Sequence, residues 1–387
     1  MTNPMHYIIY DSIAALPLAW DALAQANIFL STAYLSVLEQ SAPSNLTPHF
    51  IGLFKDEALC GIALAQYINL SGVNTLGQRE KGFCVKEYLF KKFSSQVLVL
   101  GNNMLTGQNA YLLHTDVDEV LALAEFEKAL LALKKQYRKK CIYINLITIK
   151  DFNEKEFPDF EAAGYTGYYR FSTQPNMIFT RRQQWENMDD YLAALSTKYR
   201  TQYNRARKKA CGIEKKQLDC NEIKEYGETI NQLYLTVAGN ASFNTFHLPE
   251  NHFYTFKQQL GDKFLFYGYF LDGKLIGFNT LIKNGADMDT YFLGYDASIQ
   301  KEKMLYLNML YDMAAYSINK QFSHIIYGRS AMEIKSSAGA QAEPVSGLIK
   351  HTTPLINRSM EWLFNYFEPK VAWHERSPFK AEVAVTV

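Results

Sequence analysis

A twelve-residue stretch occurs twice in this chain, and this repeat constrains the fold more than any other feature of the sequence. The run FIGLFKDEALCG at 50–61 aligns without a gap on FYGYFLDGKLIG at 266–277, with Phe, Gly, Phe, Asp, Leu and Gly in register. Each run predicts a β-hairpin, because a tight polar turn at 55–57 or 271–273 separates two β-rich segments. The sequence therefore predicts two similar hairpins.

The elements that follow the two hairpins also agree in order. After each hairpin come further strand, an apolar-periodic helix (116–138 or 304–320) and a short β-rich run (141–149 or 324–327). Two hairpins can look alike by chance, but agreement in the downstream order favours one α+β module used twice.

The 387 residues of the chain are enough for two such modules. We place the boundary between residues 164 and 181, where a Gly- and Tyr-rich stretch and Pro175 precede a new helix. We expect an N-terminal module at 1–172 and a C-terminal module at 173–387. Before the second hairpin, the pattern predicts helices at 189–211, 220–237 and 249–260.

Charge and composition exclude several classes of protein. The 40 Lys and Arg residues against 39 Asp and Glu residues give a net charge of +1, so we expect no DNA binding and any basic site must be local. The sequence has no apolar run long enough to span a membrane and no leader-like N-terminus. The five cysteines are scattered and form no close ligand pairs, so we expect a cytoplasmic protein without a metal.

The predicted helix at 189–211 carries the strongest local positive charge. Asn187 is expected to cap its start together with Asp190, and Gly212 is expected to end it. Eight Lys or Arg residues lie between 198 and 216, against one acidic residue.

Two arginines of this helix are candidate binding residues. A charge run is usually a solvated helix face. Here Arg200 and Arg205 border the apolar stripe that contains Tyr199 and Tyr203, which suits a phosphate-bearing ligand in a groove.

Three segments resemble a known family. Residues 264–296 and the helix from 304 resemble the core of a GNAT acyltransferase. KYRTQYNRARKK at 198–209 and YGRSAMEIKSSAGA at 327–340 resemble motifs of the FemAB-like (BioF2-like) branch, which is built from two GNAT modules in tandem. The resemblance implies an α+β fold of two GNAT-like modules, each a mixed central sheet flanked by helices, and N-acyltransferase activity.

The resemblance also implies where the acyl donor binds. GNAT enzymes that use acetyl-CoA usually hold its pyrophosphate on a glycine-containing turn at the start of the donor-binding helix. The corresponding segment SIQKEKML at 298–305 has no glycine. Donor binding would then depend on contacts from Lys301, Lys303, Met304 and Leu305. Some FemAB-like enzymes instead take an aminoacyl group from tRNA, and the basic helix suits that donor as well. The acceptor would be a small-molecule amine or a cell-wall precursor.

The same resemblance places the chemistry on one strand. In GNAT modules the central strand, here 288–296, splays from its neighbour and leaves backbone N–H groups for the acyl carbonyl. Asp289, Tyr291 and Tyr295 alternate along this strand and are expected to share a face. Asp289 would take the amine proton and a tyrosine would protonate the leaving group. Packing is the alternative role for each tyrosine.

Arg329, Glu333 and Lys335 complete the candidate site. If the strand ending near 327 continued, period-two geometry would place them on one side, where Glu333 and Lys335 would bind the acceptor. A surface ion pair is the alternative for these two residues. A further interpretation is a GNAT-fold protein that binds a ligand without catalysis, as the missing glycines allow.

Overall fold

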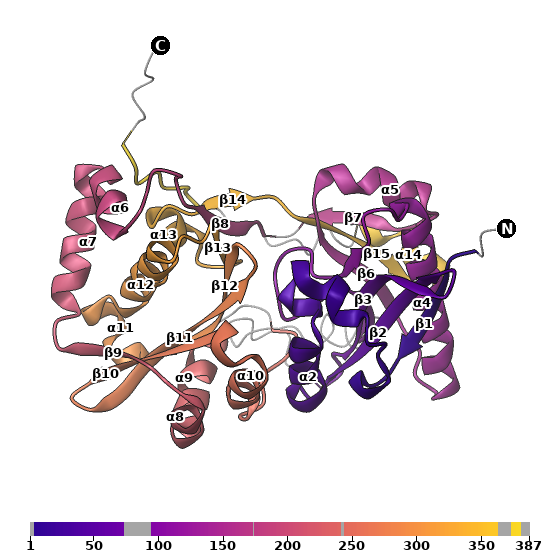
Figure 1. Cartoon of the computed structure of the whole chain (residues 1–387), viewed down its shortest axis with the longest axis horizontal. Coiled ribbons are helices and arrows are strands. Elements are labelled where there is room, and N and C mark those ends of the chain that lie inside the picture. Colours follow the sequence, from indigo (N-terminus) through magenta and orange to yellow (C-terminus); the bar gives the residue numbers. More distant parts are fainter. Residues whose placement is uncertain (1–3, 73–93, 173, 241–243, 363–372, 381–387) are drawn as a thin grey trace, which may run out of the picture. The chain divides into compact units, whose positions relative to one another are not determined.

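The chain forms two compact units, each with its own β-sheet (Figure 1). The computed structural model describes residues 4–72, 94–172, 174–240, 244–362 and 373–380. Unit 1 comprises Met1–Gln174, Ala238–Gly261 and Pro344–Lys370, and unit 2 comprises Pro175–Val237, Asp262–Glu343 and Val371–Val387. No helix in the described part of the chain is long and apolar enough to cross a membrane.

The sheet of unit 1 is mixed. Neighbouring strands run antiparallel except for β4 and β6, which are parallel. In spatial order its strands are β1 (His6–Tyr10), β2 (Leu46–Lys55), β3 (Ala58–Asn69), β4 (Gln96–Leu100), β6 (Leu146–Phe152), β15 (Ser346–His351) and β7 (Tyr169–Ser172), and β5 (Tyr111–Leu113) pairs with β3.

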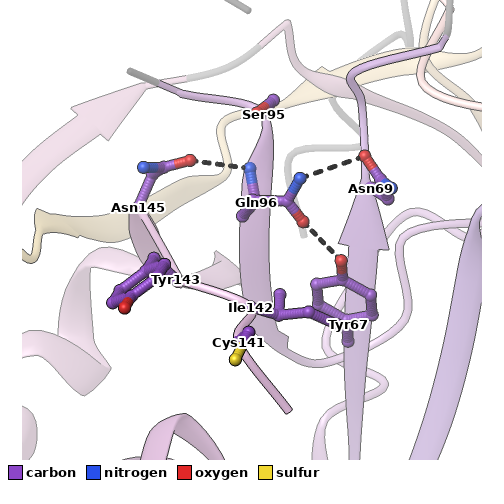
Figure 2. Close-up of a pocket in the computed structure, with 8 residues that line it drawn as sticks. All are labelled: Tyr67, Asn69, Ser95, Gln96, Cys141, Ile142, Tyr143 and Asn145. Carbon is purple, nitrogen blue, oxygen red and sulfur yellow. Dashed lines mark hydrogen bonds between the residues drawn. The ribbon is translucent and has the colours of Figure 1, made fainter. Parts of the chain in front are cut away.

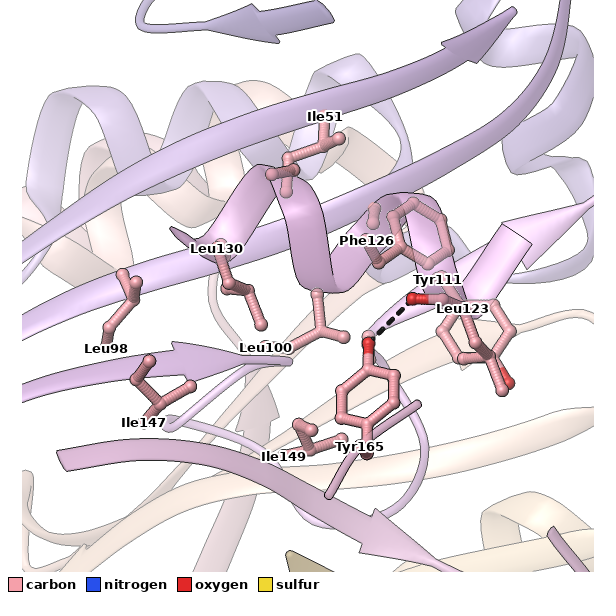
Figure 3. Packing of buried hydrophobic residues seen from close by; sticks show 14 of the residues in the cluster. Ile51, Leu98, Leu100, Tyr111, Leu123, Phe126, Leu130, Ile147, Ile149 and Tyr165 are labelled. Atoms are coloured by element: carbon pink, nitrogen blue, oxygen red, sulfur yellow. Dashed lines mark hydrogen bonds between the residues drawn. The ribbon is translucent and has the colours of Figure 1, made fainter. Parts of the chain in front are cut away.

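The predicted helix at 116–138 is α4 (Glu119–Lys139), and it forms the centre of the unit 1 core. Asp118 caps it by accepting a hydrogen bond from the backbone N–H of Leu121 at 3.0 Å. Its apolar side chains pack on the sheet, and Tyr165 donates a hydrogen bond to the carbonyl oxygen of Leu123 at 2.9 Å (Figure 3). In the described residues of the unit, the other α-helices are α1 (Trp20–Leu23), α2 (Thr32–Ser41), α5 (Phe157–Ala162), α10 (His252–Leu260) and α14 (Pro354–Asn357).

The sheet of unit 2 is also mixed, with β12 and β13 parallel and the other neighbours antiparallel. Its spatial order is β14 (Gln341–Glu343), β8 (Asn176–Thr180), β13 (His324–Gly328), β12 (Asp287–Tyr295), β11 (Lys274–Asn284), β10 (Phe264–Leu271) and β9 (Ile213–Gln217). Its helices are α6 (Met188–Ala194), α7 (Thr197–Lys209), α8 (Cys220–Glu225), α9 (Gly227–Ala238), α11 (Ala297–Lys303), α12 (Leu305–Asn319) and α13 (Met332–Ser337).

The two repeated hairpins agree even in their irregularities. Both central turn residues have positive φ in each hairpin, 48° and 65° at Asp56 and Glu57 and 50° and 75° at Asp272 and Gly273. Each hairpin also shifts register at the aligned position, before Phe54 in one and before Phe270 in the other. The predicted fold, two modules that each have a mixed sheet flanked by helices, is confirmed.

The chain passes from the sheet of unit 1 to the sheet of unit 2 before β8 and returns to the sheet of unit 1 before β15. Strand β8 follows β7 of unit 1 in sequence, but it pairs with β13 and β14 in unit 2. Conversely, β15 follows β14 of unit 2 and pairs with β6 and β7 in unit 1. Residues 238–261 and 344–370 belong to unit 1, whereas the sequence-based division grouped them with 173–387.

The prediction of a single helix at 189–211 is wrong, because the segment forms α6 and α7 with a break between them. At the break, Leu195 is extended and forms a β-bridge with Phe379, and the N–H of Ser196 donates to the carbonyl oxygen of Pro378 at 2.9 Å. The predicted cap at Asn187 and Asp190 is confirmed, and Gly212 has a φ of 85°. The helix predicted at 220–237 is likewise divided, at Tyr226 into α8 and α9, and that predicted at 249–260 begins at His252.

Replacing Phe379 by alanine is expected to lower the free energy of unfolding by about 2 kcal/mol, because this half-buried ring packs on Trp185 and Tyr191 at centroid distances of 5.3 and 5.7 Å. Denaturant unfolding monitored by tryptophan fluorescence measures the change. Ser377→Ala is the matched control, since Ser377 is exposed. Equal stability of the two variants would contradict a packing role for Phe379.

Candidate active site

Strands β12 and β13 of unit 2 pair only at their beginnings. Their register runs from Asp287 opposite His324 to Asp289 opposite Ile326, whereas β12 continues to Tyr295. Thr290 closes the paired part by donating its hydroxyl proton to the carbonyl oxygen of Ile326 at 3.0 Å. Beyond this point β12 and β13 are not paired, although β13 runs on to Gly328. A splayed central strand that presents backbone N–H groups stays a prediction.

A β-bulge lies in β12 directly after the end of its pairing with β13. The register with β11 shifts between Leu281 opposite Thr290 and Asn279 opposite Leu293, so Tyr291 and Phe292 together face Thr280. The hydroxyl group of Thr280 donates to the carbonyl oxygen of Phe292 at 2.7 Å. An extra residue of this kind reverses which side chains point to which face of the sheet.

The bulge corrects one prediction about the candidate catalytic residues. Met288 packs in the core that α12 covers, so the alternating Asp289 points to the opposite face of the sheet. Beyond the bulge, Tyr295 lies on the α12 face, with its ring centroid 6.2 Å from that of Tyr306 of α12. The expectation that Asp289 and Tyr295 share a face is therefore wrong.

Asp289 is a buried acid, with 7% of its surface exposed. The pKa of its carboxyl group is raised to about 7, mainly by burial. The amide of Asn284 lowers this pKa by donating a hydrogen bond at 3.2 Å, and the negative charge of Asp287 raises it. A carboxyl group that titrates near neutral pH is suited to accept a proton from an amine.

The start of α12 differs from a glycine turn. Helix α11 occupies the preceding segment, and Met304 has a φ of 49° between the two helices. Asn308 fixes this junction by donating its amide protons to the carbonyl oxygens of Lys303 at 3.3 Å and Met304 at 3.1 Å. Of the predicted donor-binding residues, Leu305 is fully buried and Lys301 is exposed, so these four residues do not form one surface.

The two arginines singled out in the basic segment have different environments. Arg200 donates from Nη2 to the carbonyl oxygens of Ala193 and Leu195, both at 3.2 Å, and so closes the end of α6. Arg205 is exposed on α7. A ligand-binding role for either residue stays a prediction.

The segment after β13 forms α13, so the conditional prediction of a continuing strand is wrong. Glu333 forms an ion pair with Arg376, whose Nε donates to Oε1 at 3.0 Å. Lys335 is 5% exposed, and its Nζ donates to the carbonyl oxygens of Tyr327 at 2.8 Å, Gly328 at 3.2 Å and Arg329 at 2.7 Å. Burial lowers the pKa of Lys335 to about 7. Glu333 and Lys335 are therefore not an ion pair.

The structure also contains two cavities that sequence reasoning did not find. One, of about 360 Å³ in unit 1, lies where β3 ends and β4 begins, and Gln96 within it accepts a hydrogen bond from the hydroxyl group of Tyr67 (Figure 2). The other, of about 180 Å³, lies in unit 2 beside α12. Two of its lining residues, Arg207 and Lys215, fall within the basic run 198–216, which is the only signal the sequence offered for it.

Comparison with solved structures identifies the fold. The structure of FemX aligns with 94% of this chain and 100% of its own chain, at a TM-score of 0.54 and 12% sequence identity. A tandem GNAT protein from the clavulanic acid biosynthesis pathway aligns with 90% of this chain and 99% of its own, at a TM-score of 0.50 and 10% identity. The chain therefore has the tandem GNAT fold that its FemAB-like motifs predicted. No family model matches the sequence, and no curated protein matches it significantly.

Proposed function

We propose that this protein is a cytoplasmic N-acyltransferase that transfers an acyl group from acyl-CoA to a primary amine by direct attack. The observation that carries the proposal is the end of the β12–β13 pairing at Asp289, a buried acid whose pKa is near neutral. The tandem GNAT fold supports the reaction class, because a diverging central strand is the feature on which that fold presents an acyl carbonyl.

The chemistry assigned to the site is a single acyl exchange. The amine nitrogen attacks the thioester carbonyl and forms the C–N bond, the C–S bond breaks, and Asp289 takes the proton that the nitrogen loses. The departing thiolate receives a proton from Tyr295. Burial raises the pKa of this phenol, so it carries its proton at neutral pH. Because Asp289 lies on the opposite face of β12 from Tyr295, the proton of the nitrogen reaches Asp289 through water, while Tyr295 contacts the leaving group.

Five of the remaining predicted residues are assigned to binding. Arg205, Lys301 and Lys303 supply positive charge for a phosphate-bearing donor. Arg329 and Glu333 lie beyond the end of β13, where they would contact an acceptor amine of small-molecule or cell-wall-precursor type. No group of residues in the described part of the chain is arranged to hold a metal ion, and the proposed reaction uses none.

A second candidate function is a tRNA-dependent aminoacyl transferase that acts on a peptidoglycan-type precursor. Two observations favour it: α11 takes the place of a glycine turn, and α7 exposes Lys198, Arg205 and Lys208 to solvent. Binding of charged tRNA that weakens steeply with salt would support this function, since phosphate contacts release counterions.

Acetyl-CoA or free CoA at about 1 mM is expected to raise the melting temperature, because a ligand at 100 times its dissociation constant adds about 2.7 kcal/mol to the free energy of unfolding. Differential scanning fluorimetry measures the shift, and release of free thiol in a screen of amines measures turnover. No shift with either ligand and salt-dependent binding of tRNA would replace the acyl-CoA proposal with the second candidate. Ligand binding without product from any donor or amine would indicate a non-catalytic protein.

A further inference from the structure

The cavity of about 360 Å³ in unit 1 has a lining without charge (Figure 2). Its residues come from the end of β3, the start of β4 and the loop that joins α4 to β6. The volume falls within the range of about 300–1,000 Å³ that small-molecule sites occupy. None of the described lining residues is Lys, Arg, His, Asp or Glu, and most of them carry an amide or a hydroxyl group. This chemistry fits a polar ligand without charge.

Gln96 fixes the orientation of the two asparagines in the cavity. Its backbone N–H donates to Oδ1 of Asn145 at 3.0 Å, and its Nε2 donates to Oδ1 of Asn69 at 3.2 Å. Both asparagines therefore use their side-chain oxygen as an acceptor within the protein, which leaves the NH₂ end of each amide as a donor. The hydroxyl group of Tyr67 holds Gln96 itself by donating to its Oε1 (Figure 2). The fold thus sets which end of each amide can serve a ligand.

Three polar groups of the cavity lack a partner. Among the described residues, none forms a hydrogen bond with Nδ2 of Asn69, with Nδ2 of Asn145 or with the hydroxyl group of Ser95. Ser95 is only 5% exposed, yet it lines the cavity. A buried hydroxyl group without a partner has lost hydrogen bonds to water and gained none in return. A ligand with several oxygen atoms in the cavity would pair with all three groups.

One aromatic ring at the cavity is open to solvent. Tyr143 is 65% exposed, whereas the ring of Tyr67 is covered by that of Tyr137 at a centroid distance of 4.3 Å. In the view of Figure 2, Tyr143 and Tyr67 lie on either side of Gln96. A nucleobase site usually encloses the flat base between side chains. A single open ring beside amide donors instead suits a sugar ring, which presents C–H groups on its face and hydroxyl groups at its edge.

We propose that this cavity binds an uncharged saccharide, with a sugar ring on Tyr143 and its hydroxyl groups bonded to Asn69, Asn145 and Ser95. Each hydroxyl group of a sugar both donates and accepts, so it can accept from an asparagine amide and pair with the serine hydroxyl group in either direction. The proposal does not depend on acyl transfer, because every residue named here belongs to unit 1 and the candidate catalytic residues belong to unit 2.

The test is calorimetric titration of the full-length protein with maltotriose, cellotriose and chitotriose. We expect saturable binding of at least one of them, with a dissociation constant about tenfold higher in Tyr143→Ala and in Asn145→Asp. Aspartate keeps the oxygen that Gln96 needs but has no NH₂ group to donate. Leu121→Ala is the control, because Leu121 is also an exposed apolar residue of unit 1, at 58% exposure, and does not line the cavity.

Three results of this titration would overturn the proposal. They are no binding of any of the three saccharides by the wild type, unchanged binding by both cavity variants, and binding of adenosine or uridine that requires Tyr143 in place of saccharide binding. The last of these would assign the cavity to a nucleobase.

Ser95→Ala tests the unpaired hydroxyl group without knowledge of the ligand. Because nothing in the described protein bonds to this group, its removal should weaken saccharide binding and leave the melting temperature of the free protein unchanged. A lowered melting temperature together with unchanged binding would show that the hydroxyl group serves the fold, which contradicts its assignment to a ligand.

Cys141 reports where the saccharide binds. Its exposed thiol lines the cavity, and Cys211 is an exposed thiol of unit 2 that serves as the internal control. A saturating saccharide should slow the alkylation of Cys141 by iodoacetamide and leave that of Cys211 unchanged, as measured by mass spectrometry of peptides. Equal alkylation of Cys141 with and without bound saccharide would place the ligand elsewhere and overturn the proposal.

Discussion

Replacing Asp289 by asparagine is expected to lower the turnover number at least about 100-fold, because a positioned general base contributes 10²- to 10⁴-fold to a rate. Asparagine keeps the shape of the side chain but cannot accept the proton of the attacking amine. In the wild type, activity should rise with pH through an apparent pKa near 7, since only the ionised carboxylate is a base. The variant should lack this acidic limb, which a pH profile of kcat measures.

The same substitution is expected to stabilise the protein at alkaline pH. Because the pKa of Asp289 is about 7 in the folded state against its ordinary value of 3.8, the folded protein binds more protons than the unfolded chain between these values. The free energy of unfolding of the wild type therefore falls as pH rises from about 4 to 7. The asparagine side chain does not ionise and removes this loss, which amounts to at most about 4 kcal/mol at pH 8 and disappears below pH 4.

Two other acids of unit 2, Asp262 and Asp287, provide the controls for this experiment. Asp262→Asn changes an exposed carboxylate and should affect neither turnover nor stability. Asp287→Asn should move the acidic limb to lower pH, because the charge of Asp287 raises the pKa of Asp289. Full turnover in Asp289→Asn would exclude a base role, whereas a stability difference that does not depend on pH would contradict the buried, protonated carboxyl group.

Local sequence signals predicted the repeated elements of the fold correctly. The two hairpins, the helix around 119–139 and the cap at Asn187 depend on turn residues, apolar period and side-chain hydrogen bonds within a few positions. These interactions are close in sequence, so they can be recognised without knowledge of the tertiary structure. The two register shifts at aligned positions show that the repeated segments agree in backbone detail as well as in sequence.

The features that sequence reasoning missed depend on contacts distant in the chain. The break at Leu195 follows from pairing with Phe379, and the return of β15 to the sheet of unit 1 depends on its pairing with β6 and β7. The bulge at Tyr291 and Phe292 is set by pairing with β11, and it changes the face of Tyr295. Side chains alternate strictly along a strand only while the register is unbroken. The sequence could therefore assign the candidate catalytic residues to this strand, but it could not predict which face of the sheet each one points to.

Replacing Lys335 by methionine is expected to lower the free energy of unfolding at pH 7 by about 2–4 kcal/mol, because three backbone carbonyl groups lose their donor. These carbonyls belong to the end of β13 and the turn that follows it, where Gly328, Ser330 and Ala331 have φ of 70°, 66° and 47°. Such a backbone conformation persists only where surrounding contacts hold it. Lys320→Met, which removes an exposed amine at the end of α12, is the control and should change little.

The pH dependence distinguishes the role of the Lys335 amine from a simple packing effect. Burial lowers its pKa to about 7 against its ordinary value of 10.5, so between these values the unfolded chain binds more protons than the folded protein. The free energy of unfolding of the wild type should therefore rise from pH 7 to pH 10.5, and the methionine variant should lack this rise. Urea titrations at several pH values measure this dependence. If the free energy of unfolding changes equally with pH in the two proteins, the amine keeps its ordinary pKa. A variant of normal stability that fails to bind the acceptor would instead assign Lys335 to the substrate.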